Sequence, residues 1–250
     1  MSEDMLVGAS PEPQGTEDLR AGFHHELDAI RREIATLSAD VTESIPRATQ
    51  ILLTQDLEGA EFMILSDDEI DAKCVQLEER CYSVLALQSP VASDLRQLVA
   101  AVRIIAEIER SADLAVNLCK AARRIYGHRL EPRLRGIIQR MGDQAQQLFK
   151  EATEAYLTND GARASAIGDM DSYLDGLQRE FVQAIFESHS VEKIELQVAV
   201  QLAVVARFYE RIGDHAVNIG ERVRYVVTGL LPEHNGAVRF ATRAAASDQE

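Results

Sequence analysis

The stretch ERIGDHAVNI at residues 210–219 and the stretch ERSADLAVNL at residues 109–118 are near copies of each other. They share Glu, Arg, Asp, Ala, Val and Asn at the same positions. The shared Glu, Asp and Asn recur every four residues, so on a helix they form one polar stripe. A stripe of oxygen ligands that occurs twice in one chain predicts two related half-molecules, each with a site for a hard metal ion.

Around the first copy, apolar residues step along the chain by threes and fours, which is typical of amphipathic helices. This pattern predicts a helix over residues 19–45, a second helix that opens at Pro46, and a further helical stretch that begins at Asp67. Ser89 as a cap and Pro90 as the first helical residue predict the start of the long helix that contains the stripe.

The second half repeats this plan. Pro132 opens a helix, residues 159–161 (Asn-Asp-Gly) form a turn, and Ser190 is the expected cap of the last long helix. No segment alternates with a period of two, so no sheet is predicted. We therefore expect an all-α fold of two tandem three-helix bundles related by internal duplication. The first bundle spans residues 18–128 and the second 129–229, between a disordered tail at 1–17 and a flexible tail at 230–250.

Composition restricts the function. The formal net charge is −15, which argues against nucleic acid as a partner and against direct binding to anionic lipid. No run of 18 apolar residues occurs, so no membrane span is expected, and membrane association would come only through partners. The three cysteines show no disulfide pattern and fit a reducing cytoplasm, as small core residues.

The duplicated stripe supplies the candidate metal ligands. Acidic side chains one turn apart repel each other unless a cation lies between them. Oxygen donors of this kind suit magnesium, manganese, calcium or ferric iron better than copper or thiolate-bound zinc. Neighbouring helices add acids to both halves, with Asp68 and Asp171 as further choices. The predicted metal ligands are Glu109, Asp113, Asn117 and Asp71 in the first half, and Glu210, Asp214, Asn218 and Asp175 in the second.

An ordinary structural explanation competes with this one. Arg110 and Arg211 adjoin the acids and would neutralise them as simple surface ion pairs. His215 has no histidine counterpart in the first copy, which has Leu114 there, so it is either an outer contact of the site or a core histidine.

Three segments resemble the PhoU family of bacterial phosphate-signalling regulators. They are SDDEID at residues 66–71, LQSPVASDLR at 87–96 and YERIGDHAVNI at 209–219. The likeness covers residues 19–228. The chain departs from the family at Ser111-Ala112 in the first copy, where Ile and Gly are usual, and the acidic tail at residues 1–17 has no clear role in the family.

This resemblance implies two three-helix bundles related by a pseudo-twofold axis, and metal clusters of iron, zinc, manganese or magnesium at the two Glu-x-x-x-Asp motifs. It also implies a homodimer that restrains phosphate uptake and represses phosphate-starvation genes. The implied partners are the ATPase of the phosphate ABC transporter and a sensor histidine kinase. No cofactor besides metal, and no catalysis, is implied.

Two other functions remain open from the sequence. One is a helical metalloenzyme, a phosphohydrolase or oxidase, that uses the carboxylate clusters. The chain has no P-loop, no HExxH, no GxSxG and no Glu-x-x-His pair of the di-iron type to support it. The other is a helical oligomerisation module without metal.

Overall fold

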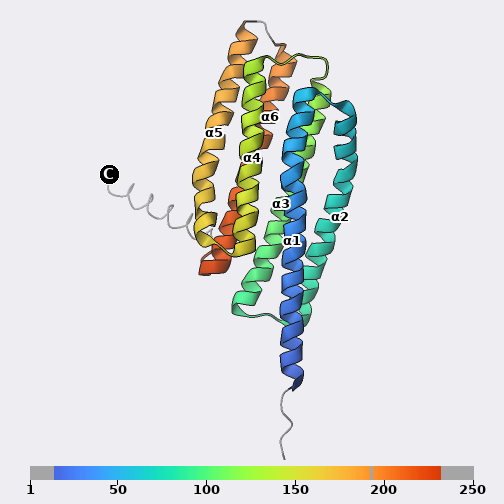
Figure 1. The fold of residues 1–250 in the computed structure, drawn as a ribbon, viewed down its shortest axis with the longest axis vertical. Coiled ribbons are helices and arrows are strands. Elements are labelled where there is room, and N and C mark those ends of the chain that lie inside the picture. The colour runs from blue at the N-terminus through green and yellow to red at the C-terminus, as the bar shows by residue number, and fades with distance from the viewer. Residues whose placement is uncertain (1–13, 192–193, 232–250) are drawn as a thin grey trace, which may run out of the picture.

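The computed structural model describes residues 14–191 and 194–231, and all regular secondary structure in this part of the chain is α-helical. The helices pack as two three-helix bundles, α1–α3 and α4–α6, which confirms the all-α prediction (Figure 1). In order they are α1 (Gln14–Thr54), α2 (Leu57–Gln88), α3 (Ala92–Arg124), α4 (Pro132–Thr158), α5 (Gly161–Ser190) and α6 (Leu196–Thr228).

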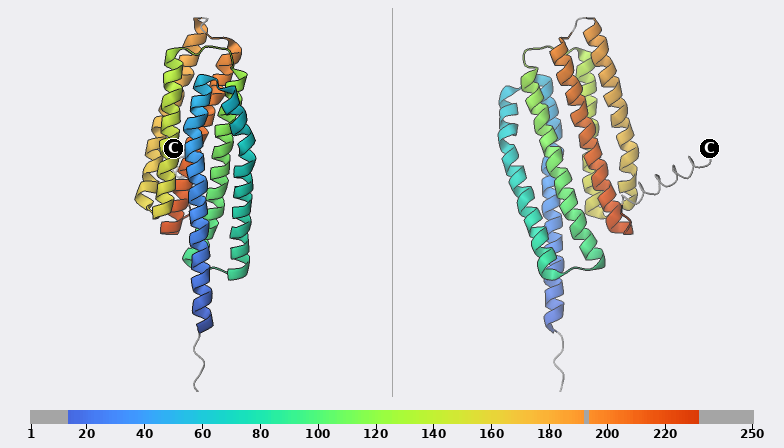
Figure 2. Two further views of the ribbon diagram at one scale, coloured as in Figure 1. Left: turned by 45° about the vertical axis from the view of Figure 1, so that its right-hand side comes forward. Right: turned by 180° about the vertical axis from the view of Figure 1, so that it is seen from behind.

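The six helices form two layers. α1 packs against α4 in one layer, while α2, α3, α6 and α5 lie in that order in the other (Figure 2). α3 and α6 run antiparallel at the centre, since Glu107 meets His215 and Arg124 meets Gln201 farther along. α3 is covered by α1, α2 and α6, and α6 by α3, α4 and α5, so both are open to solvent on one shared side. We call this side the four-helix face.

The internal duplication is visible in a pair of equivalent contacts between α1 and α4. Arg31 of α1 donates to the carbonyl of Leu157 at 2.5 Å, and Arg135 of α4 donates to the carbonyl of Leu53 at 2.6 Å. The two arginines are separated along the chain by the same number of residues as the two leucines. Each therefore places a cation on the unpaired carbonyls at the C-terminus of the other half's first helix.

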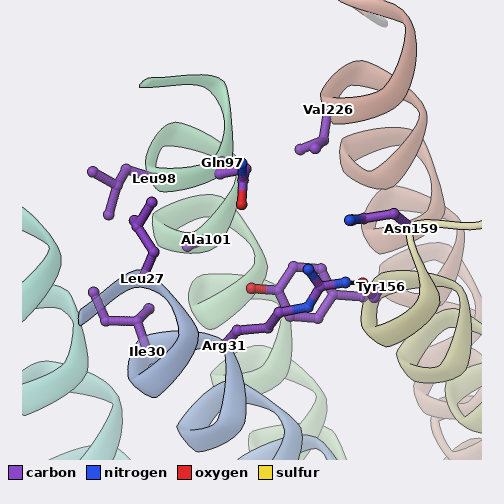
Figure 3. A pocket seen from close by; sticks show the side chains of 9 residues that line it. All are labelled: Leu27, Ile30, Arg31, Gln97, Leu98, Ala101, Tyr156, Asn159 and Val226. Carbon is purple, nitrogen blue, oxygen red and sulfur yellow. Dashed lines mark hydrogen bonds between the residues drawn. The ribbon is translucent and has the colours of Figure 1, made fainter. Parts of the chain in front are cut away.

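The Arg31 contact also closes the crossing between the bundles. Its guanidinium lies over the ring of Tyr156, 5.5 Å from the centroid, and donates to the Tyr156 carbonyl at 2.7 Å (Figure 3). The cavity beside it has a volume of only about 20 Å³, room for a single water molecule at most. This crossing is therefore a structural joint and not a ligand site.

Aspartates at the helix starts repeat as well. Asp56 caps α2 by accepting from the amide of Gly59, and Asp160 caps α5 by accepting from the amides of Ala162 and Arg163. Such caps satisfy amides that have no partner within the helix. The predicted turn at residues 159–161 is confirmed, with Asn159 in the left-handed region at φ 50°.

Three boundaries differ from the prediction. α1 continues through Pro46, because the flanking Ile45 and Ala48 are fully buried and their packing outweighs one lost backbone hydrogen bond. Asp67 lies within α2 and does not begin a helix. The expected tail at 1–17 is wrong for residues 14–17, which belong to α1, while residues 1–13 lie outside the described part of the chain.

The expected caps at the third helix of each half are also wrong. Ser89 is the C-cap of α2, with φ 45°, and Val91 occupies the N-cap position of α3 without a side-chain bond. Ser190 ends α5, and Glu195 precedes α6. In both cases the serine lies at the end of the preceding helix, and the next helix begins three to six residues later. Residues 232–250, most of the predicted second tail, lie outside the described part of the chain.

Side-chain packing follows the apolar periodicity throughout both bundles. The largest completely buried side chains include Tyr209, Phe149 and Phe181, and Tyr209 shares a 2.8 Å hydrogen bond with Thr49 across the bundle boundary. Among the described helices, none has a stretch both long and apolar enough to cross a bilayer.

Candidate metal centres

α2 and α3 bring four carboxylates together at the four-helix face. Asp67 occupies a core-facing position of α2, in line with the buried Met63 and Cys74. Burial, together with the nearby charges of Asp71 and Asp113, raises the pKa of Asp67 to about 6. Burial and the neighbouring acids also raise the pKa values of Asp71 and Glu109. We call this group the first acidic cluster: Asp67, Asp71, Glu109 and Asp113.

α5 and α6 form the matching group in the second half. Asp171 lies in line with the buried Ile167 and Leu174 of α5. Burial, as the largest cause, and the charges of Asp175, Asp214 and Glu210 together raise the pKa of Asp171 to about 6. Mutual repulsion of this kind is the electrostatic situation that a bound cation resolves. We call this group the second acidic cluster: Asp171, Asp175, Glu210 and Asp214.

One buried carboxylate oxygen in each half lacks a hydrogen-bond partner in the described residues. These atoms are Oδ1 of Asp67 and Oδ1 of Asp171, which occupy equivalent positions in the two bundles. Buried polar atoms are nearly always paired, so a repeated orphan calls for an explanation. A hard cation that accepts oxygen ligands supplies one, and the donor set of carboxylates therefore fits a metal.

Small residues make room for these two carboxylates. A Cβ atom added at Gly213 would lie 2.3 Å from Oδ1 of Asp171, so only glycine allows that carboxylate to lie against α6. The equivalent residue in the first half is Ala112, which lines a cavity of about 180 Å³ together with Asp67. The departure from the family pattern at Ala112 is thus accommodated by extra space beside Asp67.

The side chains do not yet form a finished coordination shell. Within residues 14–191 and 194–231, no three His, Cys, Asp or Glu side chains form a group that could hold an ion as they stand. Metal binding requires carboxylates such as Asp71 and Asp175 to turn toward a common point. Both are partly or largely exposed, which leaves their side chains room to turn.

Arginine pairing explains only part of the acidic stripe. Arg207, rather than Arg211, donates to both carboxylate oxygens of Glu210. Arg110 lies 3.7 Å from Glu107 and has no ion pair with Glu109 in the described residues. The competing explanation by simple ion pairs therefore holds for Glu210 and fails for Glu109.

The two asparagines of the stripe make no hydrogen bond to the acidic clusters within residues 14–191 and 194–231. Asn218 donates to Oε2 of Glu107 at 3.2 Å, on the neighbouring helix α3. Asn117 shows no contact with either cluster in the part of the chain that the structure describes. Their role as metal ligands stays a prediction. It rests on helical periodicity alone, which does not distinguish the side of a helix that faces α2 or α5 from the side that faces the α3–α6 seam.

His215 proves to be a core histidine. It is 6% exposed, and its Nδ1 lies 2.6 Å from Oε2 of Glu107. The contacts to His215 and Asn218 lower the pKa of Glu107 although burial opposes this. This buried polar bridge joins the two bundles at the centre of the molecule. At the equivalent crossing the chain has Leu114 and Phe208 instead.

Two residues of the site region were missed from the sequence. The exposed Asp68 was considered as a ligand, and Asp67 was not. The available signal was that Asp67 falls on the apolar side of α2, where it interrupts a line of apolar residues. Glu107 was not selected, although it lies among buried neighbours in the apolar part of α3.

Comparisons with known proteins identify similar chains. The family model described as PhoU domain matches residues 34–122 and 138–223. PhoU homolog 2 of Mycobacterium tuberculosis, a phosphate-specific transport system accessory protein, is 34% identical over 215 residues, which is 86% of this chain and 100% of that protein. The PhoU homolog of Clostridium acetobutylicum is 28% identical over 85% of this chain and 97% of its own.

Solved structures agree with these matches. The crystal structure of PhoU from Pseudomonas aeruginosa superimposes with a TM-score of 0.78 at 26% identity, over 83% of this chain and 100% of that one. The phosphate transport system regulatory protein PhoU from Streptococcus pneumoniae gives 0.77 at 24% identity, over 84% and 98%, which supports the fold.

Proposed function

Because this chain belongs to the PhoU family, we propose that it is a regulatory accessory protein of phosphate transport. The observation that carries this proposal is the extent of the match. The curated relative of Mycobacterium tuberculosis is matched over its entire length, and that protein is named an accessory protein of a phosphate-specific transport system.

In this proposal the protein acts by contact and not by catalysis. It links the ATPase of the phosphate ABC transporter to a sensor histidine kinase, restrains phosphate uptake and represses phosphate-starvation genes. It works as a homodimer in the cytoplasm and reaches the membrane only through these partners. The four-helix face supports this role, since the helices that carry both acidic clusters, α2, α3, α5 and α6, form one layer backed by α1 and α4 (Figure 2).

Metal ions at the two acidic clusters belong to the proposal. Asp67, Asp71, Glu109 and Asp113 would hold one site, and their four counterparts the other. Carboxylate donors favour a hard ion, so magnesium, manganese or ferric iron fits better than zinc. A bound ion would neutralise the clustered charge and offer a coordination position to an acidic group of a partner. The paired orphan oxygens of Asp67 and Asp171 support this assignment.

The proposal is tested by purifying the protein from phosphate-replete cells and identifying, in the same sample, the bound metal and the co-purified proteins. We expect stoichiometric metal together with the transporter ATPase and the kinase. The double variant Glu210→Ala, Asp214→Ala should lose metal and release partners, whereas the control variant Asp169→Asn, at an exposed acid of α5, should lose neither. Loss of metal with regulation intact would contradict the role of the metal in partner binding.

A further inference from the structure

The pseudo-twofold axis of the molecule crosses the four-helix face at an identifiable point. Glu107 of α3 lies opposite His215 of α6, and these two helices are antiparallel. Ser111 lies one turn after Glu107 on α3, and Arg211 lies one turn before His215 on α6. These two residues therefore also lie opposite each other. The duplication pairs Ser111 with Ile212, the residue after Arg211, so the residues that lie opposite each other here are within one residue of being copies of each other. The axis therefore passes between Ser111 and Ile212.

Two equivalent arginines flank this axis. They are Arg110 and Arg211, each directly preceding the residue at the axis, and both are exposed. Arg110 reaches toward the seam, 3.7 Å from Glu107, which itself bonds to α6. Arg211 has no ion pair among the described residues. Since α3 and α6 are open to solvent on one shared side, both guanidinium groups belong to the four-helix face.

The surroundings of this arginine pair differ in charge from the rest of the protein. α3 and α6 together contain ten Arg or Lys and seven Asp or Glu, whereas the whole chain has a net charge of −15. Apart from Glu107, which lies beside Arg110, the acids that flank the pair on α3 and α6 are those of the two acidic clusters, one on each side. Without metal these eight carboxylates offset the arginines. With metal they are neutralised, and a cationic strip runs from one cluster across the axis to the other.

We propose that Arg110 and Arg211 form the centre of a docking surface for an acidic segment of a partner protein, and that metal at both clusters opens this surface; the second part rests on the proposed function. Guanidinium groups suit the task because their fork of donors matches a carboxylate in two parallel hydrogen bonds. The segment is short, since the acidic surface beyond the four-helix face repels a longer polyanion such as nucleic acid.

The test uses the full-length protein and a fluorescein-labelled decapeptide of glutamate, with a decapeptide of glutamine as the uncharged control. Binding is followed by fluorescence anisotropy in manganese and in EDTA. We expect the glutamate peptide to bind in manganese only, with an affinity that falls as salt is raised. The double variant Arg110→Ala, Arg211→Ala should weaken binding at least tenfold. The control variant Arg123→Ala, Arg224→Ala removes two exposed arginines of the same helices and should bind as the unchanged protein does.

Calorimetric manganese uptake, measured on every variant, separates this inference from the proposed function. The Arg110/Arg211 double variant should still take up metal, because neither arginine is a ligand. Equal peptide binding by this variant and the unchanged protein overturns the inference while leaving the metal sites intact. Full peptide binding in EDTA overturns the metal-dependent part. Absence of metal uptake in the unchanged protein contradicts the proposed function itself.

Discussion

Replacing Asp171 by asparagine should stabilise the metal-free protein at neutral pH. In the folded state the pKa of Asp171 is raised from 3.8 to about 6, mainly by burial. The folded protein therefore holds this proton more tightly than the unfolded chain. Stability falls as the pH rises from about 4 to 6, and the whole penalty is present at pH 7.

The magnitude follows from the size of this shift. Two pH units correspond to about 3 kcal/mol, and solvent screening at a half-buried site reduces the measurable effect to about 1–2 kcal/mol. Asparagine has nearly the same shape and no charge, so Asp171→Asn should raise the free energy of unfolding of the metal-free protein by this amount at pH 7.5. The gain should shrink to less than half at pH 4.5, where the folded wild-type carboxyl is protonated.

The assay is urea unfolding of chelator-treated protein at the two pH values, followed by circular dichroism. Asp169→Asn is the matched control, because that residue is exposed and only half a turn away on α5. It should change stability by less than about 0.5 kcal/mol, as is usual for surface substitutions. An Asp171→Asn protein that is no more stable than wild type at pH 7.5, or equally stabilised at both pH values, would refute the reasoning.

Three further predictions concern the joints of the structure. Gly213→Ala should lower the free energy of unfolding in urea by about 1–3 kcal/mol and weaken manganese uptake by the second acidic cluster, because its Cβ would overlap a carboxylate oxygen of Asp171. Unchanged uptake would show that this carboxylate does not bind metal. His215→Leu should lower the free energy of unfolding by about 3–5 kcal/mol, because Glu107 would stay buried without its partner. The double variant Glu107→Phe, His215→Leu should recover stability, because it copies the apolar crossing of the other half. A double variant less stable than the single one would contradict this. Arg31→Ala and Arg135→Ala should each lower the free energy of unfolding by a similar amount, about 1–2 kcal/mol, because the two arginines make equivalent hydrogen bonds to helix C-termini. A large difference between the two variants would contradict the symmetry.

The helices and their duplication were predictable from the sequence because both depend on local periodicity. Apolar residues at spacings of three and four determine which side of each helix is buried, and repeated motifs determine which helices correspond. Helix ends were less predictable. Pro46 and Ser190 read as boundaries, yet packing of the neighbouring buried residues carries α1 past the first and α5 up to the second.

The candidate site shows the same division. Glu109 and Glu210, with the aspartate one turn after each, were found from the duplicated stripe, which is a local signal. Asp67 depends on tertiary packing, because its importance comes from lying in a core position against α3. Asn218 was predicted as a ligand from the same stripe, and its amide donates to Glu107 across the α3–α6 seam, a contact that depends on how α6 is rotated against its neighbours.

The central claim is that each half of the molecule holds metal through its own acidic cluster. Calorimetric titration of manganese into chelator-treated protein tests this most directly, in wild type and in the variants Asp67→Asn and Asp171→Asn. We predict two binding sites in wild type and the loss of one, in the matching half, in each variant. Absence of uptake by the wild-type protein, or uptake that neither substitution alters, would contradict the claim.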